Sequence, residues 1–423
     1  MRGLMLLAAL AVALPAGALE WDYRSMEGRQ ATCIRADDEH ARIFVGTIEG
    51  FHYLDIPTGE WTSRDWEGWI GRTVRSITGH REHDQRVITG RVNAFFKGYI
   101  ELSDDLGETE AQVCSSQGGA VNGLATDPDD ADRMYACTWH DVAPGEVLRS
   151  SDGGETWTLL EGTIHYAMTS IVTDIAGAIF VGGDERVTRS LDGGETWETA
   201  RTGLPDAYGI YCLAADPEQT GHLFASNDIG LYETQSSGAS WSQIHPASCR
   251  SLATSPTILS IPGGPTYRPV AAATWDERVL LSLDGGRTWE DISGNLAPAV
   301  PVAVDVSMTD RRLYVATTAD GVFSRPIADL SAAEPPAPGE AGMRLHCPRP
   351  IRGAARFEFR TTRPGPALLE ILDVSGRWQT TLLDRWLPAG NHTVTGAVGS
   401  RGVHFGRLRC ADGEVVTRMV VLR

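Results

Sequence analysis

The chain contains 423 residues and carries a formal net charge of −18 at pH 7. That length exceeds a typical single compact core, unless the fold is a large barrel or a propeller, and 46 Gly with 22 Pro indicate many tight turns. The negative charge argues against binding to nucleic acid or to an anionic membrane surface.

The first 18 residues have the pattern of a secretory signal peptide. One positive charge at Arg2 precedes an apolar run from Leu4 to Leu14, and Ala16-Gly17-Ala18 provides a small-residue cleavage site. The run is too short to span a membrane, and no other segment approaches its length. We therefore expect residues 1–18 to be removed and the mature protein to be secreted or held at the cell surface, without membrane insertion.

An eight-residue pattern recurs along the chain, and its best copies begin at Ser150, Ser190 and Ser282. The first of them reads Ser-Ser-Asp-Gly-Gly-Glu-Thr-Trp. A worn copy begins at Thr234, and one without the tryptophan begins at Ser103, so successive starts lie 47, 40, 44 and 48 residues apart. A period in the forties is typical of a propeller blade of four short strands.

Two further repeats lack this pattern but keep its apolar runs between turn residues, as in Arg42–Thr47 and Arg312–Thr317. Such runs suit strands buried between neighbouring blades, and together they indicate seven blades. The last repeat ends near Pro326 without a fourth strand. The sequence therefore predicts an all-β fold with a seven-bladed β-propeller over residues 19–327, in which residues near 20–25 complete the last blade.

The recurring pattern S-x-D-x-G-x-T-W resembles the Asp box, or BNR repeat, of sialidase-like propellers. Its glycines allow a tight reversal, its aspartate can accept hydrogen bonds from turn amides, and its tryptophan covers apolar surface of the blade. The resemblance implies a structural role at the periphery, away from the propeller axis, for Asp105, Asp152, Trp157, Asp192, Trp197, Trp241, Asp284 and Trp289.

The last part of the chain predicts a separate domain. Residues 328–342 form a Pro-rich linker, and residues 343–423 alternate strands with turns. Ile371–Arg377, Ala389–His392 and Gly402–Phe405 resemble the type A sorting domain of the bacterial type IX secretion system, and equally the immunoglobulin-like domain of flagellar hook-capping proteins. The resemblance implies a small immunoglobulin-like β-sandwich recognised by an export machinery, in a bacterium with an outer membrane. Thr395-Gly396 and His404 depart from the sorting pattern, so an adhesion-type sandwich stays open.

The seven cysteines are an odd number, so at least one is unpaired within the chain or linked to another chain. Cys347 and Cys410 are a possible disulfide within the tail, and Cys212 and Cys249 occupy equivalent places in consecutive repeats. The alternative for each pair is that of buried reduced thiols, which pack as small hydrophobic groups.

No catalytic residue can be assigned from the sequence. Sialidases share an Arg-Ile-Pro motif, an arginine triad that binds the substrate carboxylate and a Tyr/Glu pair, and none of these maps onto this chain. A carboxylate pair of the kind that other glycan hydrolases use cannot be identified either. The favoured interpretation is a non-enzymatic binding scaffold, with an exo-acting glycoside hydrolase as the alternative.

The residues best suited to ligand binding are expected on the face opposite the Asp boxes, where second strands end and first strands begin. Aromatic groups beside carboxylates suit a carbohydrate, a peptide or a cation, although solvated rim residues look the same in sequence. The candidates are Trp66, Trp69, Arg72, Trp139, His140, Tyr166, Asp184, Tyr208, Asp228, Trp275, Asp276 and Asp320.

We expect no cofactor and no metal site, because the pair His140-Asp141 has no second cluster with ligand spacing to complete it. The expected partners are an extracellular protein or glycan and, through the tail, an export machinery.

Overall fold

The structure is a computed structural model. It describes residues 21–26, 28–65, 73–116, 119–140, 144–162, 167–184, 186–206, 209–256, 259–260, 266–327, 345–346, 351–352, 354–361, 365–373, 377–387, 390–397, 402–410 and 413–422. Strands dominate these ranges, which contain one short 3-10 helix, η1 (Gly294–Leu296). No helical segment within them is long and apolar enough to cross a membrane.

Contacts divide the chain into two compact units. The larger covers Met1–Leu259 and Thr266–Ala328, and the smaller covers Asp329–Arg423 together with Ser260–Pro265. Within the described residues the larger unit contains seven four-stranded antiparallel sheets, which we number blades 1 to 7.

The strands of blades 1 to 3 follow chain order. They are β2 (Ala31–Asp37), β3 (Arg42–Thr47), β4 (Gly50–Asp55) and β5 (Glu60–Asp65); β6 (Thr73–His80), β7 (His83–Val92), β8 (Gly98–Ser103) and β9 (Ala111–Ser115); and β10 (Ala120–Thr126), β11 (Arg133–Trp139), β12 (Val147–Ser151) and β13 (Thr158–Leu160).

Blades 4 to 6 repeat this order. They contain β14 (Met168–Thr173), β15 (Ile179–Gly183), β16 (Arg186–Ser190) and β17 (Glu198–Thr199); β18 (Cys212–Ala215), β19 (Leu223–Asn227), β20 (Gly230–Thr234) and β21 (Ser242–His245); and β22 (Cys249–Thr254), β25 (Val270–Thr274), β26 (Val279–Ser282) and β27 (Glu290–Asp291). A short hairpin of β23 (Leu259–Ser260) and β24 (Thr266–Tyr267) is inserted in blade 6.

Blade 7 joins the two ends of the propeller sequence. It consists of β28 (Pro301–Ser307), β29 (Arg312–Thr317), β30 (Val322–Pro326) and β1 (Asp22–Ser25), with β1 antiparallel to β30. The prediction that the N-terminal strand completes the last blade is therefore confirmed. Trp21, just before β1, is 4% exposed and donates from its indole nitrogen to the carbonyl of Ile292 at 2.8 Å.

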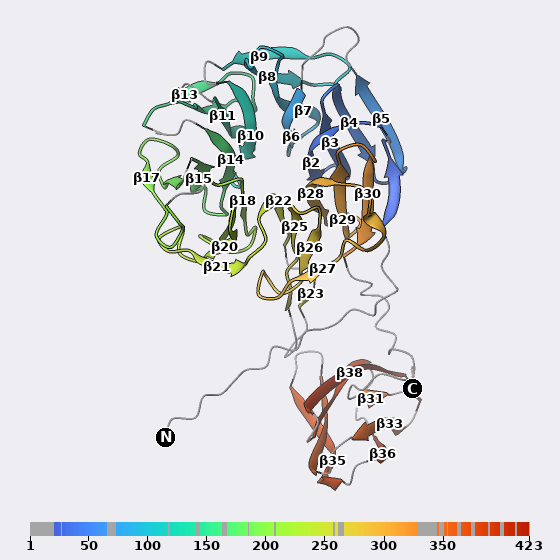
Figure 1. Cartoon of the computed structure of the whole chain (residues 1–423). Coiled ribbons are helices and arrows are strands. Elements are labelled where there is room, and N and C mark those ends of the chain that lie inside the picture. Colours follow the sequence, from blue (N-terminus) through green and yellow to red (C-terminus); the bar gives the residue numbers. More distant parts are fainter. Residues whose placement is uncertain are drawn as a thin grey trace. The chain divides into compact units, whose positions relative to one another are not determined.

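The first strand of each blade lies innermost around the ring (Figure 1), and consecutive first strands contact one another, with β28 against β2. Second strands lie between neighbouring blades: Ile43 and Val45 of β3 are fully buried and share a core cluster with Tyr314 and Ala316 of β29. A strand covered on both faces is apolar without alternation. The expected all-β propeller is confirmed.

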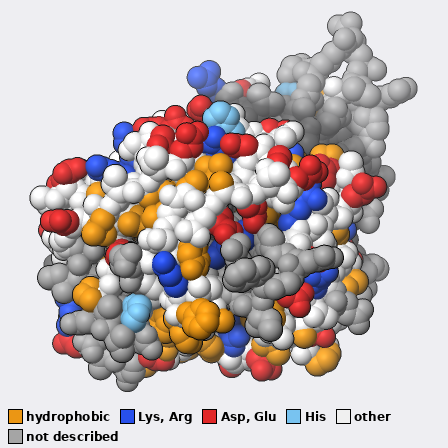
Figure 2. All heavy atoms as spheres, turned by 90° about the horizontal axis from the view of Figure 1, so that it is seen from above, with side chains coloured by type: hydrophobic (Ala, Val, Ile, Leu, Met, Phe, Trp, Pro, Cys, Tyr) orange, Lys and Arg blue, Asp and Glu red, His pale blue; other side chains and the backbone are white. Residues whose placement is uncertain are grey.

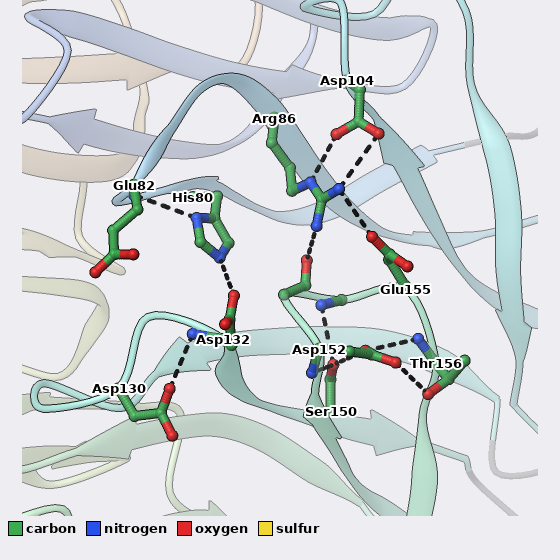
Figure 3. Close-up of polar contacts among 12 residues, drawn as sticks. His80, Glu82, Arg86, Asp104, Asp130, Asp132, Ser150, Asp152, Glu155 and Thr156 are labelled. Carbon is green, nitrogen blue, oxygen red and sulfur yellow. Dashed lines mark hydrogen bonds and ion pairs between the residues drawn. The ribbon is translucent and has the colours of Figure 1, made fainter.

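The recurring eight-residue pattern forms the turn between third and fourth strands. In blade 3, Asp152 accepts hydrogen bonds from the backbone N–H of Thr156 at 2.9 Å and from the hydroxyls of Ser150 and Thr156, as Figure 3 shows. Gly153 and Gly154 have φ of 68° and 93°, in the left-handed region that favours glycine. Glycine thus allows the backbone conformation of the turn, and the carboxylate accepts the hydrogen bonds of its donors.

The smaller unit is a two-sheet β-sandwich in its described residues. One sheet contains β31 (Leu345–His346), β33 (Ala354–Thr361) and β36 (Gly390–Ala397), and the other contains β32 (Ile351–Arg352), β34 (Gly365–Leu372), β35 (Trp378–Leu387), β37 (Gly402–Cys410) and β38 (Gly413–Leu422). Phe357, Leu369 and Leu408 are fully buried in its core. The expected linker, 328–342, and Cys347 lie outside the described residues.

Cys212 and Cys249, at equivalent places in blades 5 and 6, are neighbours. The thiol of Cys212 donates to the carbonyl of Cys249 at 3.5 Å, and both cysteines are reduced. Burial raises the pKa of both thiols, that of Cys249 to about 12. They therefore act as packing groups between two blades.

Candidate functional site

The first strands of the propeller share one irregularity at the same repeat position. In six blades the register between first and second strands shifts by one residue, at Thr32, Arg75, Asn122, Thr169, Arg250 and Val302. In blade 5 the equivalent residue is Tyr211, directly before β18. A β-bulge turns its extra residue out of the regular ladder. All seven residues line a central cavity of about 480 Å³, and we call them the bulge ring.

The bulge ring contains two arginines and no carboxylate. None of the other described residues lining this cavity is Asp, Glu or His. Arg75 is exposed and forms no ion pair within the described part of the chain, unlike Arg86, which pairs with Asp104. In a protein with a net charge of −18, unpaired positive charge at the cavity favours an anionic ligand.

An aromatic and cationic cluster lies where blades 5 and 6 meet the cavity. The guanidinium of Arg250 lies 4.3 Å from the centre of the Trp275 ring, and Trp275 is 50% exposed. The centre of the Tyr211 ring lies 5.4 Å from that of Trp275, with an angle of 60° between the two ring planes. Among the described residues, Arg250 donates one long hydrogen bond, to the carbonyl of Trp275 at 3.4 Å. Most of its five donors are thus left for a ligand.

Local charges set the protonation of this cluster. The hydroxyl of Tyr211 donates to Asp228, and this hydrogen bond, with burial, raises the pKa of Tyr211 to about 12. Burial lowers the pKa of Arg250, but a guanidinium remains protonated in proteins at neutral pH. At neutral pH the cluster therefore offers a phenol, an indole and a guanidinium.

A second aromatic group lies at blades 2 and 3. Phe95 and Phe96, in the turn between β7 and β8, are 88% and 65% exposed. Asn93 shapes this turn, because its side-chain oxygen accepts from the backbone N–H groups of Phe95 and Lys97. Phe96 lines a cavity of about 270 Å³ together with Arg75 and Trp139.

The two aromatic groups, one with Phe96 and the other with Trp275, therefore lie on opposite sides of the central cavity, which we also call the channel. Their first strands β6 and β22 lie on opposite sides of the ring in Figure 1, and Arg75 and Arg250 both line the central cavity. Figure 2, turned by 90° from Figure 1, looks onto the outer edge of the propeller, where acidic and basic side chains are interspersed with hydrophobic ones.

Seven of the twelve predicted ligand-binding residues are described, and all seven follow or end a second strand, as expected. They are Trp139, His140, Asp184, Asp228, Trp275, Asp276 and Asp320. The other five, Trp66, Trp69, Arg72, Tyr166 and Tyr208, lie outside the described residues.

The structure brings two of the predicted residues, Asp228 and Trp275, together through Tyr211. Asp276 pairs with Arg278 at 2.7 Å, and this contact lowers the pKa of Asp276. Asp184 accepts from the backbone N–H of Ala167 at 2.8 Å, so this carboxylate supports its own blade.

Sequence reasoning missed Tyr211, Arg250, Arg75, Phe95 and Phe96. The first three precede a small residue and an aliphatic one in the repeated first strand, as in Arg75-Ser76-Ile77 and Tyr211-Cys212-Leu213. Aligning the first strands of the repeats would have revealed this position. Phe95 and Phe96 lie in the second-to-third strand turn of blade 2, for which the sequence analysis named no candidate.

The cavity does not have the residue set of either hydrolase considered. Arg35 also lines the cavity. It lies three positions further along its strand than the bulge-ring residue Thr32, which places it about 10 Å deeper in the cavity. Arg35 approaches Asp305 at 4.0 Å and borders a second cavity with Arg81 and Asp127. Arg35, Arg75 and Arg250 therefore do not form one cluster, and no described carboxylate lines the central cavity.

No protein-family model matches the chain, and no curated protein matches it. Among solved structures, YCF48 bound to D1 peptide has a TM-score of 0.53 at 13% identity, covering 76% of this chain and 99% of that one. The β-propeller domain of Cps50 (Swd1) from Myceliophteria thermophila has 0.53 at 13%, covering 73% and 100%. The GH74 xyloglucanase from Xanthomonas campestris has 0.55 at 16%, covering 81% and 60%.

At these identities the likeness establishes the fold alone. The similar structures include a peptide-bound protein and a glycoside hydrolase, so the fold does not decide between binding and catalysis. What these comparisons and the sheet topology together establish is a β-propeller.

Proposed function

We propose that the protein is an exported, non-enzymatic binding propeller of the Asp-box type, which holds an extended acidic segment of an extracellular protein across the bulge ring. The observation that carries this proposal is the pair of arginines, Arg75 and Arg250, in one cavity whose described lining contains no carboxylate. A guanidinium binds a carboxylate through two parallel hydrogen bonds.

The aromatic groups on the two sides suit such a ligand. Exposed Phe96 and Trp275 offer flat apolar surfaces on opposite sides of the channel, each near an arginine. Aromatic and arginine side chains are the groups that most often dominate binding energy at protein interfaces. YCF48, a similar propeller, was solved with a peptide bound.

The alternative is an exo-acting glycoside hydrolase. The contact between Tyr211 and Asp228 favours it, because a tyrosine beside a carboxylate resembles the nucleophilic pair of sialidases, and a xyloglucanase is among the similar structures. Against it, the pKa of Tyr211 is raised to about 12, which disfavours the phenolate. Glycoside hydrolysis also needs a carboxylic acid poised to donate a proton, and no described carboxyl group lines the cavity.

The test is fluorescence anisotropy with short fluorescein-labelled peptides that combine glutamates with aromatic residues, beside versions with lysine in place of glutamate. We expect the acidic peptides to bind more tightly, the affinity to fall with added salt, and the double variant Arg75→Ala/Arg250→Ala to lose at least about tenfold. Arg287→Ala removes an exposed arginine from the turn between β26 and β27 and is the matched control.

Equal affinity of the double variant and the control for acidic peptides would refute the proposed site. Turnover of a fluorogenic sialoside or of xyloglucan, abolished by Tyr211→Phe or Asp228→Asn, would instead establish the hydrolase. Tyr211→Phe removes only the hydroxyl and keeps the ring against Trp275.

The same proposal gives the smaller unit a role in export, on the resemblance of its sequence to sorting and hook-capping domains. We infer that residues 1–18 are a signal peptide and that residues 343–423 form an immunoglobulin-like domain that another protein recognises. Its buried core of Phe357, Leu369 and Leu408 supports an independent folding unit.

A further inference from the structure

A pair of histidines flanks the turn between the first two strands of blade 2. His80 ends β6, His83 begins β7, and the two are direct partners in the ladder. Directly opposed residues of two antiparallel strands point to the same face, and the two imidazole rings have their centres 4.6 Å apart. The hairpin therefore holds two imidazoles side by side.

Blade 3 adds a carboxylate to this pair. Asp132, in the turn between β10 and β11, places a carboxylate oxygen 3.1 Å from Nε2 of His80 (Figure 3). One ligand atom from each of His80, His83 and Asp132 lies within 4.8 Å of the others. Tetrahedral Zn²⁺ holds its ligand atoms about 3.3 Å apart. Rotation of the exposed side chains of His83 and Asp132 can close that difference, because His80 alone is buried.

The two ring nitrogens of His80 have different partners. Nδ1 accepts from the backbone N–H of Glu82 at 3.2 Å, and Nε2 carries the proton that is donated to Asp132. A metal at Nε2 moves this proton to Nδ1 and releases the Glu82 amide, which lies in an exposed turn where water can accept its hydrogen bond.

The nearest basic group drawn in Figure 3 is neutralised by partners outside the cluster. It is Arg86, whose guanidinium is held by Asp104 at 2.6 Å and by Glu155 at 3.1 Å. A Cβ atom on Gly153 would lie 2.8 Å from Nη1 of Arg86, 3.0 Å from Nε2 of His80 and 3.1 Å from the Asp132 oxygen, so the blade 3 turn closes over the cluster with no side chain at Gly153.

We propose that His80, His83 and Asp132 bind Zn²⁺ or a similar divalent transition metal, which joins blade 2 to blade 3. Two imidazole nitrogens favour these ions over Ca²⁺ and Mg²⁺, which prefer oxygen ligands. The ligands come from two hairpins that begin 47 residues apart in the repeat (Thr73 to Ala120). The site lies at the ends of first strands opposite the bulge ring and is therefore independent of the peptide site.

The test uses the full chain without a histidine tag, titrated with Zn²⁺ in a calorimeter and melted with and without Zn²⁺. We expect one Zn²⁺ per chain and a rise of the melting midpoint of at least about 3 °C at saturation, with no rise in Ca²⁺. His83→Gln and Asp132→Asn change exposed side chains and should each weaken Zn²⁺ binding at least about tenfold. His40→Gln, in the corresponding turn of blade 1, is the matched control and should bind as the wild type does.

Unchanged Zn²⁺ affinity in both His83→Gln and Asp132→Asn would overturn the site, as would a wild type that binds no Zn²⁺ at millimolar concentration. A second readout is the visible absorption of bound Co²⁺, which reports its coordination geometry. The wild type should give a spectrum that differs from that of His83→Gln; identical spectra would also overturn the proposal. Each variant is first compared with the wild type by circular dichroism, so that loss of folding is not read as loss of a ligand.

Discussion

A buried histidine in blade 5 should make the stability of the propeller fall at high pH. His222, directly before β19, is 4% exposed. Its Nδ1 lies 2.7 Å from a carboxylate oxygen of Asp216, and its Nε2 lies 2.8 Å from one of Glu233. An imidazolium can donate to both, whereas a neutral ring turns one lone pair toward a carboxylate.

The magnitude follows from the pKa. Burial alone would lower the pKa of His222, but the hydrogen bonds and charges of Asp216 and Glu233 raise it from 6.5 to about 9. Because the folded pKa lies above the unfolded one, the stabilisation is fully present below about pH 6.5 and is lost as the pH rises through about 9. The difference corresponds to about 3 kcal/mol, or about 2 kcal/mol after solvent screening at the partly exposed Glu233 side chain.

The assay is urea unfolding of the full chain at pH 6, 8 and 10, followed by tryptophan fluorescence, for the wild type and His222→Gln. The variant should be less stable than the wild type by about 2–3 kcal/mol at pH 6, because two carboxylates lose their shared cation, and by much less at pH 10. Groups that titrate in both proteins cancel in this difference. His245→Gln is the control, since burial lowers the pKa of His245 from its ordinary value and its ring is therefore already neutral at pH 8. A difference between wild type and His222→Gln that is the same at pH 6 and pH 10 would refute the reasoning.

Three further predictions follow from the same geometry. Asp152→Ala removes the acceptor of three hydrogen bonds in the blade 3 turn and should lower the free energy of unfolding by about 1–2 kcal/mol, measured by urea unfolding; an unchanged midpoint would contradict the role given to the turn. Trp275→Ala should weaken binding of the acidic aromatic peptides at least about tenfold while leaving the melting midpoint unchanged, because the side chain is half exposed; Trp378→Ala, in the smaller unit, is the control. Deletion of residues 341–423 should leave the propeller folded and cause it to accumulate in the periplasm of a host that has the type IX secretion system. Unchanged secretion, measured by cell fractionation, would contradict the sorting role.

The parts of the fold that depend on local interactions were predictable from sequence. The turn at Asp152 is a closed set of hydrogen bonds within eight residues, so its sequence pattern is explicit and recurs. The apolar second strands were equally readable, since burial on both faces gives a continuous run such as Ile43-Phe44-Val45. The pairing of β1 with β30 was inferable because blade 7 lacked a strand.

The candidate sites were harder to predict because they join residues that are distant in sequence. Arg250 contacts Trp275 across the β22–β25 pair, and Tyr211 reaches the Trp275 ring from the preceding blade. His80 and Asp132 likewise meet only where blade 2 packs on blade 3. The sequence analysis looked for metal ligands close together in the chain, at His140-Asp141, and therefore missed a cluster whose third member comes from the next repeat.

The bulge ring separates the demands of the fold from those of a ligand. The residue before each ring position is buried, as Val74, Val121 and Met168 are, and the residue after it is small, because neighbouring first strands crowd there. The ring position itself is filled by Thr, Arg, Asn, Tyr or Val, so packing does not dictate its side chain. Folding requirements alone do not account for arginine at two of these seven equivalent positions, each beside an aromatic side chain. The choice of Arg75 and Arg250 is better explained by what the channel binds.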